Sequence, residues 1–401
     1  MTLWLIVRKS LRQHVLSTVV TSLSIALAGG LLMSVWMVKA QSRATFTQIN
    51  GGFDAVLGAR SSKLQLVLNA IFHLEASPAN IAWSDYLEIQ KNPNVELAIP
   101  IAMGDNYRGY RVVGTLPELF TKTEYAPGRR YAIKPPGRIF DLGLREAVVG
   151  SFVAQKLGLK RGDVFHPYHG LTFDEKEEHA EEYLVVGILE PSNTPADRVI
   201  WIPLEGVQKM SGHAAEAATE VSAVLIKLRT LVAGKTLEMF YNRQNARLTF
   251  AWPIGATIGE LLNKISWFDR VLAVVAYLVA VVAAGSVLAS IYNSMNERRR
   301  QIALLRALGA HRATIFCTVV LEAVSIAILG MLIGFLIYGV IMMAVASIVR
   351  AQTGVVLEPL AWHAVMLWTP LGMIGLSALS GIVPAIKAYF TDVAGNLAPV
   401  S

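Results

Sequence analysis

The feature that most constrains this chain is a set of four long apolar runs. Three of them contain no charged side chain: Leu16–Val38, Val271–Tyr292 and Ala323–Val349. The fourth, Ala361–Ile386, has His363 as its one ionisable residue. A helix needs about 20 apolar residues to cross the hydrocarbon core of a bilayer. The sequence therefore predicts an α-helical membrane protein with four transmembrane helices, the first of them an uncleaved anchor.

Lysine and arginine next to the runs indicate how the helices cross the membrane, because these residues accumulate in short cytoplasmic loops. They are frequent before the first run and between the second and third: Arg8, Lys9, Arg12, Arg298, Arg299, Arg300, Arg306 and Arg312. The loop between the third and fourth runs has only Arg350. We expect both termini and the arginine-rich loop in the cytoplasm, and a large region outside.

These patterns divide the chain into nine expected segments. They are a cytoplasmic N-terminal segment (1–15), helix 1 (16–38), a large mixed α/β extracytoplasmic domain with stalk helices (39–268), helix 2 (269–292), a cytoplasmic loop (293–317), helix 3 (318–349), an outer loop (350–360), helix 4 (361–386) and a cytoplasmic tail (387–401).

Composition agrees with a membrane protein and argues against two other classes. Only 16% of the residues are charged, against about 25% in soluble domains. The net charge of +7 is explained by the cytoplasmic loops, so we expect no nucleic-acid partner. With Cys317 as its single cysteine, the outer domain has no internal disulfide and must rest on its own core.

The outer region reads as a mixed α/β domain. Six short runs rich in valine, isoleucine and aromatic residues are predicted strands: Val95–Ala102, Arg111–Gly114, Glu146–Val149, Tyr183–Leu189, Val199–Ile202 and Val221–Leu228. Helices are predicted at Asp85–Gln90 and Phe152–Leu157, the latter capped by Gly158. Apolar residues from Ile258 to Phe268 have helical spacing and lead straight into the second run, which predicts one continuous helix.

Small residues recur at helical spacing inside the spans. They are Ser22, Ala26 and Gly30 in the first span and Gly330 and Gly334 in the third. Small side chains let helix backbones approach closely in lipid. We therefore expect these residues in helix packing. An ion pathway usually needs ionisable side chains at mid-membrane, and the spans lack them, so a solute channel in a single copy is not expected.

The cytoplasmic loop contains an amphipathic stretch, Asn296-Glu-Arg-Arg-Arg-Gln-Ile-Ala-Leu-Leu-Arg-Ala-Leu-Gly-Ala-His-Arg312. An apolar stripe edged by arginine suits a lipid headgroup surface or a groove on a partner protein. The stretch resembles the coupling loop of the FtsX-like/MacB-like ABC transporter permeases, whose pattern reads like ERRREIGILRALGA. Glu322-Ala323, Pro384-Ala-Ile-Lys-Ala388, the 148–163 segment and the 187–198 segment extend the resemblance. Val393 stands where the family has proline after aspartate.

The resemblance implies a MacB-like periplasmic domain and a non-catalytic permease in a bacterial inner membrane. It implies dimers, homodimeric or heterodimeric, and ATP with magnesium on a separate ATPase subunit whose motion reaches the outer domain by mechanotransmission. The expected ATPase-coupling residues are Glu297, Arg298, Arg299, Arg300, Ile302, Leu305, Arg306 and Leu308. Cytoplasmic segments total only about 55 residues and hold no phosphate loop. Outside, Gly234-Lys235-Thr236 mimics the end of one, but position 229 is arginine where glycine is needed.

A histidine-rich stretch lies in the outer domain. His166, His169 and His179 fall within fourteen residues, mixed with carboxylates. Imidazole and carboxylate groups are competent zinc ligands. The stretch is therefore either a solvated charged loop or a site for zinc or an extracytoplasmic partner.

Three other functions share the same expected fold and coupling loop. The chain could be an FtsX-like regulator of an extracytoplasmic enzyme, a lipoprotein-extracting permease, or an accessory of zinc uptake, the last suggested only by the histidine-rich stretch. The sequence does not separate them, and it does not name a substrate.

Overall fold

The computed structural model describes residues 3–48, 50–211, 215–297, 299–307, 309–353, 356–358 and 360–390. The chain divides into two compact units. The helical unit comprises Met1–Gln41, Ile265–Ser347 and Glu358–Ser401. The sheet unit comprises Ser42–Lys264 and Ile348–Leu357.

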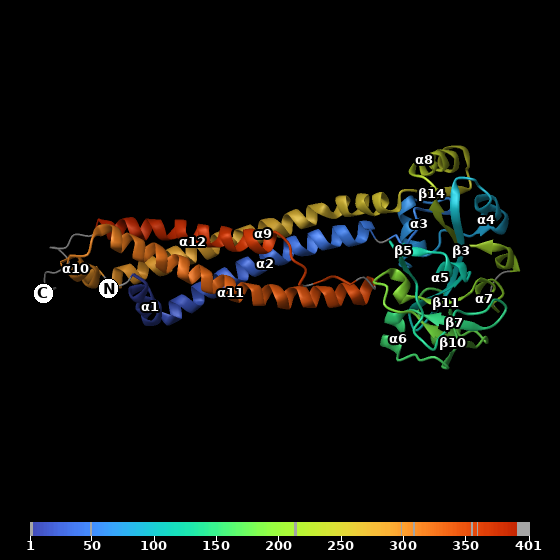
Figure 1. The fold of residues 1–401 in the computed structure, drawn as a ribbon, viewed down its shortest axis with the longest axis horizontal. Helices are drawn as coiled ribbons and strands as arrows, with labels where there is room; N and C mark the ends of the chain where they lie inside the picture. Colours follow the sequence, from blue (N-terminus) through green and yellow to red (C-terminus); the bar gives the residue numbers. More distant parts are fainter. Residues whose placement is uncertain are drawn as a thin grey trace. The chain divides into compact units, whose positions relative to one another are not determined.

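Among the described residues, six helices contribute to the helical unit, which Figure 1 draws. They are α1 (Leu3–Gln13), α2 (Val15–Gln48), α9 (Ile254–Glu297), α10 (Arg299–Ala307), α11 (Arg312–Thr353) and α12 (Val365–Tyr389). Four are long and apolar enough to cross a membrane, over Val15–Gln41, Ser266–Met295, Arg312–Gln352 and Val365–Tyr389. These are the four helices that the apolar runs predict, so the protein is a membrane protein.

The four spanning helices pack on a shared apolar core. It includes Met33 of α2, Ala283 of α9, Ala327 of α11 and Met373 of α12, all nearly inaccessible. Many large apolar side chains on the other faces of these helices are exposed in the isolated chain. An apolar outer surface is what contact with lipid requires.

Helix α9 is one unbroken helix, as the apolar spacing predicts. Its first residues, Ile254 and Ile258, are buried in the core of the sheet unit. Its later residues form the span Ser266–Met295. Glycine and proline, which weaken helices, are nearly absent from it: the helix holds Gly255, Gly259 and Gly285, and no proline.

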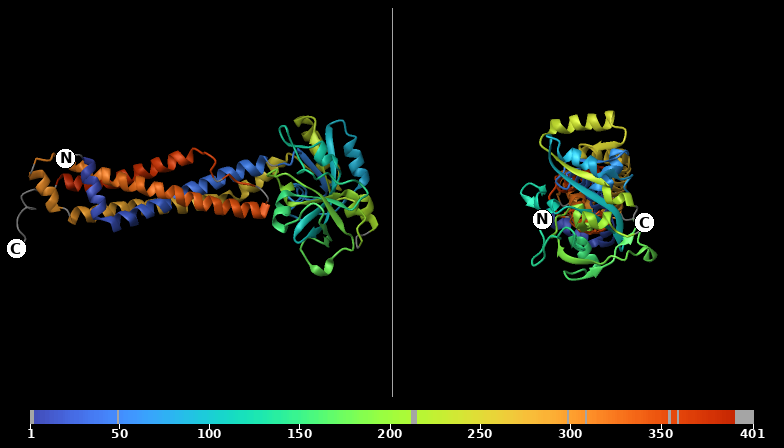
Figure 2. Two further views of the ribbon diagram at one scale, coloured as in Figure 1. Left: turned by 60° about the horizontal axis from the view of Figure 1, so that its bottom comes forward. Right: turned by 90° about the vertical axis from the view of Figure 1, so that its right-hand side faces the viewer.

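The sheet unit is built on a ten-stranded mixed sheet (Figure 2). The strand order is β14-β1-β13-β3-β4-β11-β7-β10-β8, and β9 pairs with β3 off this path. The strands are β1 (Ala55–Ala59), β3 (Val95–Tyr107), β4 (Tyr110–Thr115), β7 (Glu146–Val149), β8 (Val164–Phe165), β9 (Tyr168–His169), β10 (Tyr183–Ile188), β11 (Ile200–Pro203), β13 (Ala223–Leu228) and β14 (Leu248–Ala251).

Short elements complete the unit. Two small sheets pair β2 (Ile81–Ala82) with β12 (Glu220–Val221) and β5 (Glu124–Ala126) with β6 (Arg129–Arg130). The helices are α3 (Lys63–Ala70), α4 (Trp83–Gln90), α5 (Glu118–Thr121), α6 (Ser151–Leu157), α7 (Leu204–Gln208) and α8 (Leu231–Met239). Short helical turns lie at Glu175–Glu177, Pro195–Arg198, Ala215–Thr219 and Phe240–Gln244.

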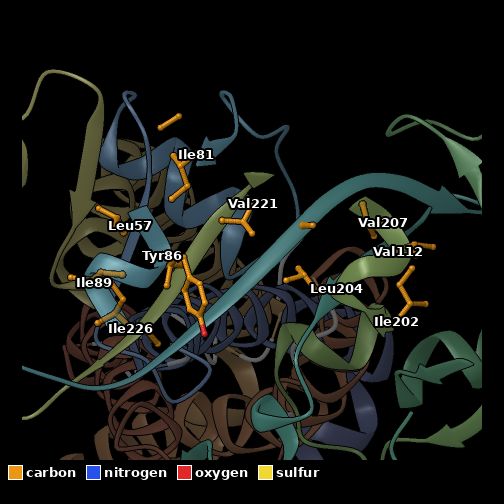
Figure 3. Packing of buried hydrophobic residues seen from close by; sticks show 14 of the residues in the cluster. Leu57, Ile81, Tyr86, Ile89, Val112, Ile202, Leu204, Val207, Val221 and Ile226 are labelled. Atoms are coloured by element: carbon orange, nitrogen blue, oxygen red, sulfur yellow. The ribbon is translucent and has the colours of Figure 1, made fainter. Parts of the chain in front are cut away.

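Both faces of the large sheet are buried. Successive residues of a strand point to opposite faces, so Leu57 of β1 joins one core cluster and Val56 the other. In the same way, Ile202 and Trp201 of β11 lie in different clusters. Helices α4 and α7 contribute to the first cluster, which Figure 3 shows around Tyr86. Burial on both faces explains why the strands read as continuous apolar runs.

The predicted elements of the outer domain are present with changed ends. Each predicted strand overlaps a strand of the large sheet, and 221–228 is divided between β13 of that sheet and β12 of a small sheet. Gly158 caps α6 in the left-handed conformation, with φ of 71°. Four strands of the large sheet, β1, β8, β9 and β14, are not predicted from the sequence. The sequence reading also ended β3 at Ala102, whereas the strand continues to Tyr107 through an irregularity between Met103 and Asp105.

Candidate functional site

Helix α10 forms a short amphipathic segment between the two long helices α9 and α11. Its end has the hydrogen bonds of a Schellman cap: Gly309 N donates to Arg306 O, and Ala310 N donates to Leu305 O. Gly309 adopts φ of 97°, a conformation that costs little only for glycine. Gly309 and Ala310 therefore close the end of α10 before α11 begins.

Burial divides α10 into an anchoring face and an outward face. Ile302 is 8% exposed and Ala303 is fully buried, and Ile302 belongs to the core of the bundle. Leu304 is 48% exposed, while Leu305 and Arg306 are half-buried. The sequence placed Ile302 on the docking surface, but the structure uses it to hold α10 on the bundle. Leu304, which the sequence reading passed over, presents the exposed apolar surface.

Several of the expected coupling residues fall outside what the structure describes. Arg298 and Leu308 lie outside the described residues. For Glu297, Arg299 and Arg300 the helical backbone is described and the side chains are not. Their role stays a prediction.

Basic side chains gather at the same end of the bundle. The Arg312 guanidinium, at the start of α11, lies 5.7 Å from the ring centre of Tyr389 at the end of α12. The Lys387 ammonium lies 4.0 Å from the ring centre of Tyr292. Cations over aromatic rings are held in place by the ring quadrupole. Arg306 of α10 is a further basic residue of this end.

The amphipathic helix α1 also packs at this end. Its Val7 and Ser10 are buried, and the Ser10 hydroxyl donates a hydrogen bond to the Glu322 carboxylate of α11. Trp4 is 65% exposed. A helix with one buried and one exposed apolar edge suits the membrane surface.

The small residues of α2 and α11 lie against each other. A Cβ atom added at Gly330 would come within 2.8 Å of the Ile25 side chain and of the Ser22 carbonyl oxygen. One added at Gly30 would lie 3.0 Å from the Gly334 carbonyl oxygen, and one at Gly334 would lie 3.2 Å from the Ala26 carbonyl oxygen. The structure therefore places all five expected packing residues at one close contact between two backbones.

The histidine-rich stretch folds against strand β3. Strand β9 pairs with β3 in antiparallel register, so that His169 lies directly opposite Asp105. The His179 Nε2 atom lies 3.1 Å from Asp105 Oδ1, and the His169 Nδ1 atom lies 3.6 Å from the same oxygen. Asp105 is fully buried, while the His169 side chain is 49% exposed. The structure thus brings two of the three expected histidines together around a carboxylate.

The third histidine and a neighbouring carboxylate have other contacts. His166 Nε2 lies 3.4 Å from Glu182 Oε1. Glu181 accepts hydrogen bonds from the amide and hydroxyl of Ser211, at 3.0 and 2.9 Å. Burial by itself would raise the pKa of Glu181, but these hydrogen bonds outweigh it and hold the pKa below its usual range.

Family models cover most of the chain. The MacB-like periplasmic core domain matches residues 17–238, more than half of the chain. The FtsX-like permease C-terminal model matches residues 273–393. With its four spans and mixed α/β domain, the protein is therefore an ABC transporter permease. It belongs to the permease family that carries a MacB-like periplasmic core and an FtsX-like C-terminal part.

Curated relatives carry the same description. An ABC transporter permease of Methanocaldococcus jannaschii is 24% identical over 220 residues, which is 54% of this chain and 53% of the relative. One from Mycobacterium tuberculosis is 27% identical over 215 residues, 53% of this chain and 56% of the relative. The chain thus spans about half the length of the curated relatives it matches.

Two solved structures are similar to part of the chain. The periplasmic region of MacB from Actinobacillus actinomycetemcomitans aligns with a TM-score of 0.35 and 12% identity, over 53% of this chain and 94% of that one. The extracellular domain of the transporter YknZ from Gram-positive bacteria aligns with a TM-score of 0.30 and 14% identity, over 49% of this chain and 99% of that one.

Proposed function

We propose that this permease transmits force. A separate ATPase subunit binds the α10 end of the helical unit, and the spanning helices relay its ATP-driven movement to the sheet unit, which acts on a substrate or partner outside the membrane. The chain works as a dimer in a bacterial inner membrane, with both termini and α10 in the cytoplasm.

One observation carries this proposal: α9 is a single helix whose first residues are buried in the core of the sheet unit and whose last residues reach the α10 segment. A continuous helix resists sharp kinks, because a kink at one point disrupts backbone hydrogen bonds. Such an element can carry displacement between two sites without a solute pathway. The lack of charged side chains in the runs 16–38, 271–292 and 323–349 agrees with this role.

The α10 end supplies the features of a docking surface. Leu304 offers an exposed apolar side chain, and α10, the start of α11 and the end of α12 carry the basic residues Arg306, Arg312 and Lys387. An apolar anchor with a charged rim is the usual composition of a protein interface. We therefore expect the ATPase to present an apolar groove with an acidic rim.

The test is purification of the chain from its native membrane in mild detergent. We expect an ATPase subunit to accompany the wild-type chain and to show ATP hydrolysis that depends on the permease. Leu304→Asp places a charge on the outward face of α10 and should reduce both the recovered ATPase and its stimulation at least tenfold.

The matched control is Leu360→Asp, which changes another exposed leucine (86% exposed) beyond the opposite end of α11. This variant should retain the ATPase. If Leu304→Asp retains it equally, α10 is not the docking surface. If the wild-type chain never recovers an ATPase, the force-transmission proposal fails.

A further inference from the structure

We propose that the sheet unit binds one divalent transition-metal cation, of which zinc is the best fit, through Asp105, His169 and His179. The inference stands on the sheet unit alone and does not depend on the proposed coupling to an ATPase.

The three side chains supply a recognised set of donors. Two imidazoles and one carboxylate hold zinc in many proteins, with a fourth position left for water or a ligand. The three potential ligand atoms, one per residue, all lie within 4.8 Å of one another. In the described part of the chain, this is the one group of three histidine, cysteine or acidic residues with that convergence.

The two distances to Asp105 Oδ1, which also fit ion pairs, lie in the range expected between ligands of one cation. Two ligands at 2.0–2.1 Å from a tetrahedral zinc are about 3.3–3.4 Å apart. The observed separations of 3.1 and 3.6 Å from Asp105 Oδ1 to the two imidazole nitrogens bracket that value.

The backbone holds the ligands in place before any cation arrives. Asp105 and His169 are cross-strand neighbours, and the amide of His179 donates to the Pro167 carbonyl at 2.9 Å. The buried Asn106 side chain donates to three carbonyls of the loop, those of Tyr168, Gly170 and Thr172. Such support from outside the ligand set fixes ligand orientation and raises metal affinity.

The exposure of the ligands indicates an exchangeable site. Asp105 and His179 are buried, whereas the His169 side chain is 49% exposed and sits at the mouth of the cluster. One open side leaves the fourth position to water or to a ligand from a carrier, in contrast to closed structural zinc sites with four protein ligands. The site suits receiving or handing over a cation outside the membrane.

The experiment is equilibrium dialysis of the full chain, purified in detergent without a histidine tag, against Zn²⁺, with bound metal measured by mass spectrometry. We expect one zinc per chain. His169→Ala, which changes an exposed side chain, should weaken binding by more than tenfold, and Asp105→Asn should do the same. Circular dichroism of each variant confirms that the domain is folded.

The matched control is His166→Ala, which removes a histidine of the same stretch that lies outside the cluster. It should bind zinc like the wild-type chain. The amount of bound zinc should also be unchanged in an excess of Mg²⁺ or Ca²⁺, because those cations prefer oxygen ligands. The proposal is overturned if the folded His169→Ala chain binds zinc with wild-type affinity, if His166→Ala loses it equally, or if the wild-type chain binds none.

Discussion

Different interactions stabilise each of the two units of this permease. The sheet unit buries both faces of a ten-stranded sheet between apolar clusters, so removal of apolar surface from water stabilises it. In the helical unit that driving force is weak between helices, because lipid tails are as apolar as leucine. Its close contact depends instead on small residues of α2 and α11. The sheet unit is therefore expected to behave as a rigid body, and the bundle as the part that rearranges.

The largest expected effect comes from the core of the sheet unit. Phe250 is fully buried and its ring centre lies 5.9 Å from that of Tyr241. Phe250→Ala should lower the free energy of unfolding of the sheet unit by about 3–5 kcal/mol, as is usual for truncating a buried aromatic residue. Denaturant unfolding followed by near-UV circular dichroism measures this. Phe173→Ala, at an exposed ring, should change it little, and an equal effect would contradict this picture of the core.

A second effect concerns how the stability of the sheet unit depends on pH. Burial, and then the charge of Arg111, lower the pKa of His73 from 6.5 to about 3. Between these values the unfolded chain binds a proton that the folded chain does not. The stabilisation of the folded state by the neutral form of His73 is therefore fully present above pH 6.5. It is lost as the pH falls toward 3.

At pH 5 the sheet unit should have lost about 2 kcal/mol of stability through this histidine. His73→Asn removes the titrating ring, and asparagine tolerates the φ of 54° found there. The variant should lose stability less steeply between pH 7 and pH 5, as measured by unfolding at each pH. An unchanged slope would show that His73 does not cause the acid sensitivity.

The smallest of the three effects concerns the bundle. Gly330→Ala adds a Cβ atom within 2.8 Å of Ile25 and should separate α2 from α11 at a cost of about 1 kcal/mol, the low end for overpacking. Unfolding in mixed detergent and SDS micelles, followed by helical circular dichroism, measures it. Gly339→Ala is the matched control, since its added Cβ has no neighbour within 4 Å. Equal behaviour of the two variants would argue against close packing of the bundle.

The membrane helices could be predicted from the sequence because the hydrocarbon core requires a long run of apolar residues in every span. A run of about 20 uncharged residues admits few alternatives, and the structure has helices at all four runs. The strands were readable in the same way from their apolar content. Their ends were not, as β3 shows. Gly104, Asp105 and Asn106 favour turns, yet in the structure they continue the strand through an irregularity.

Local pattern also predicted the amphipathic character of α10, and it supplied two histidines of the proposed cation site. Only the tertiary structure decided that Ile302 turns into the bundle and Leu304 outward, because burial depends on which helices lie beneath. Only it brought Asp105 to His169 and His179, more than 60 positions further along the chain. Hydrogen bonding between strands sets that register, and no periodicity within a single strand encodes its partner.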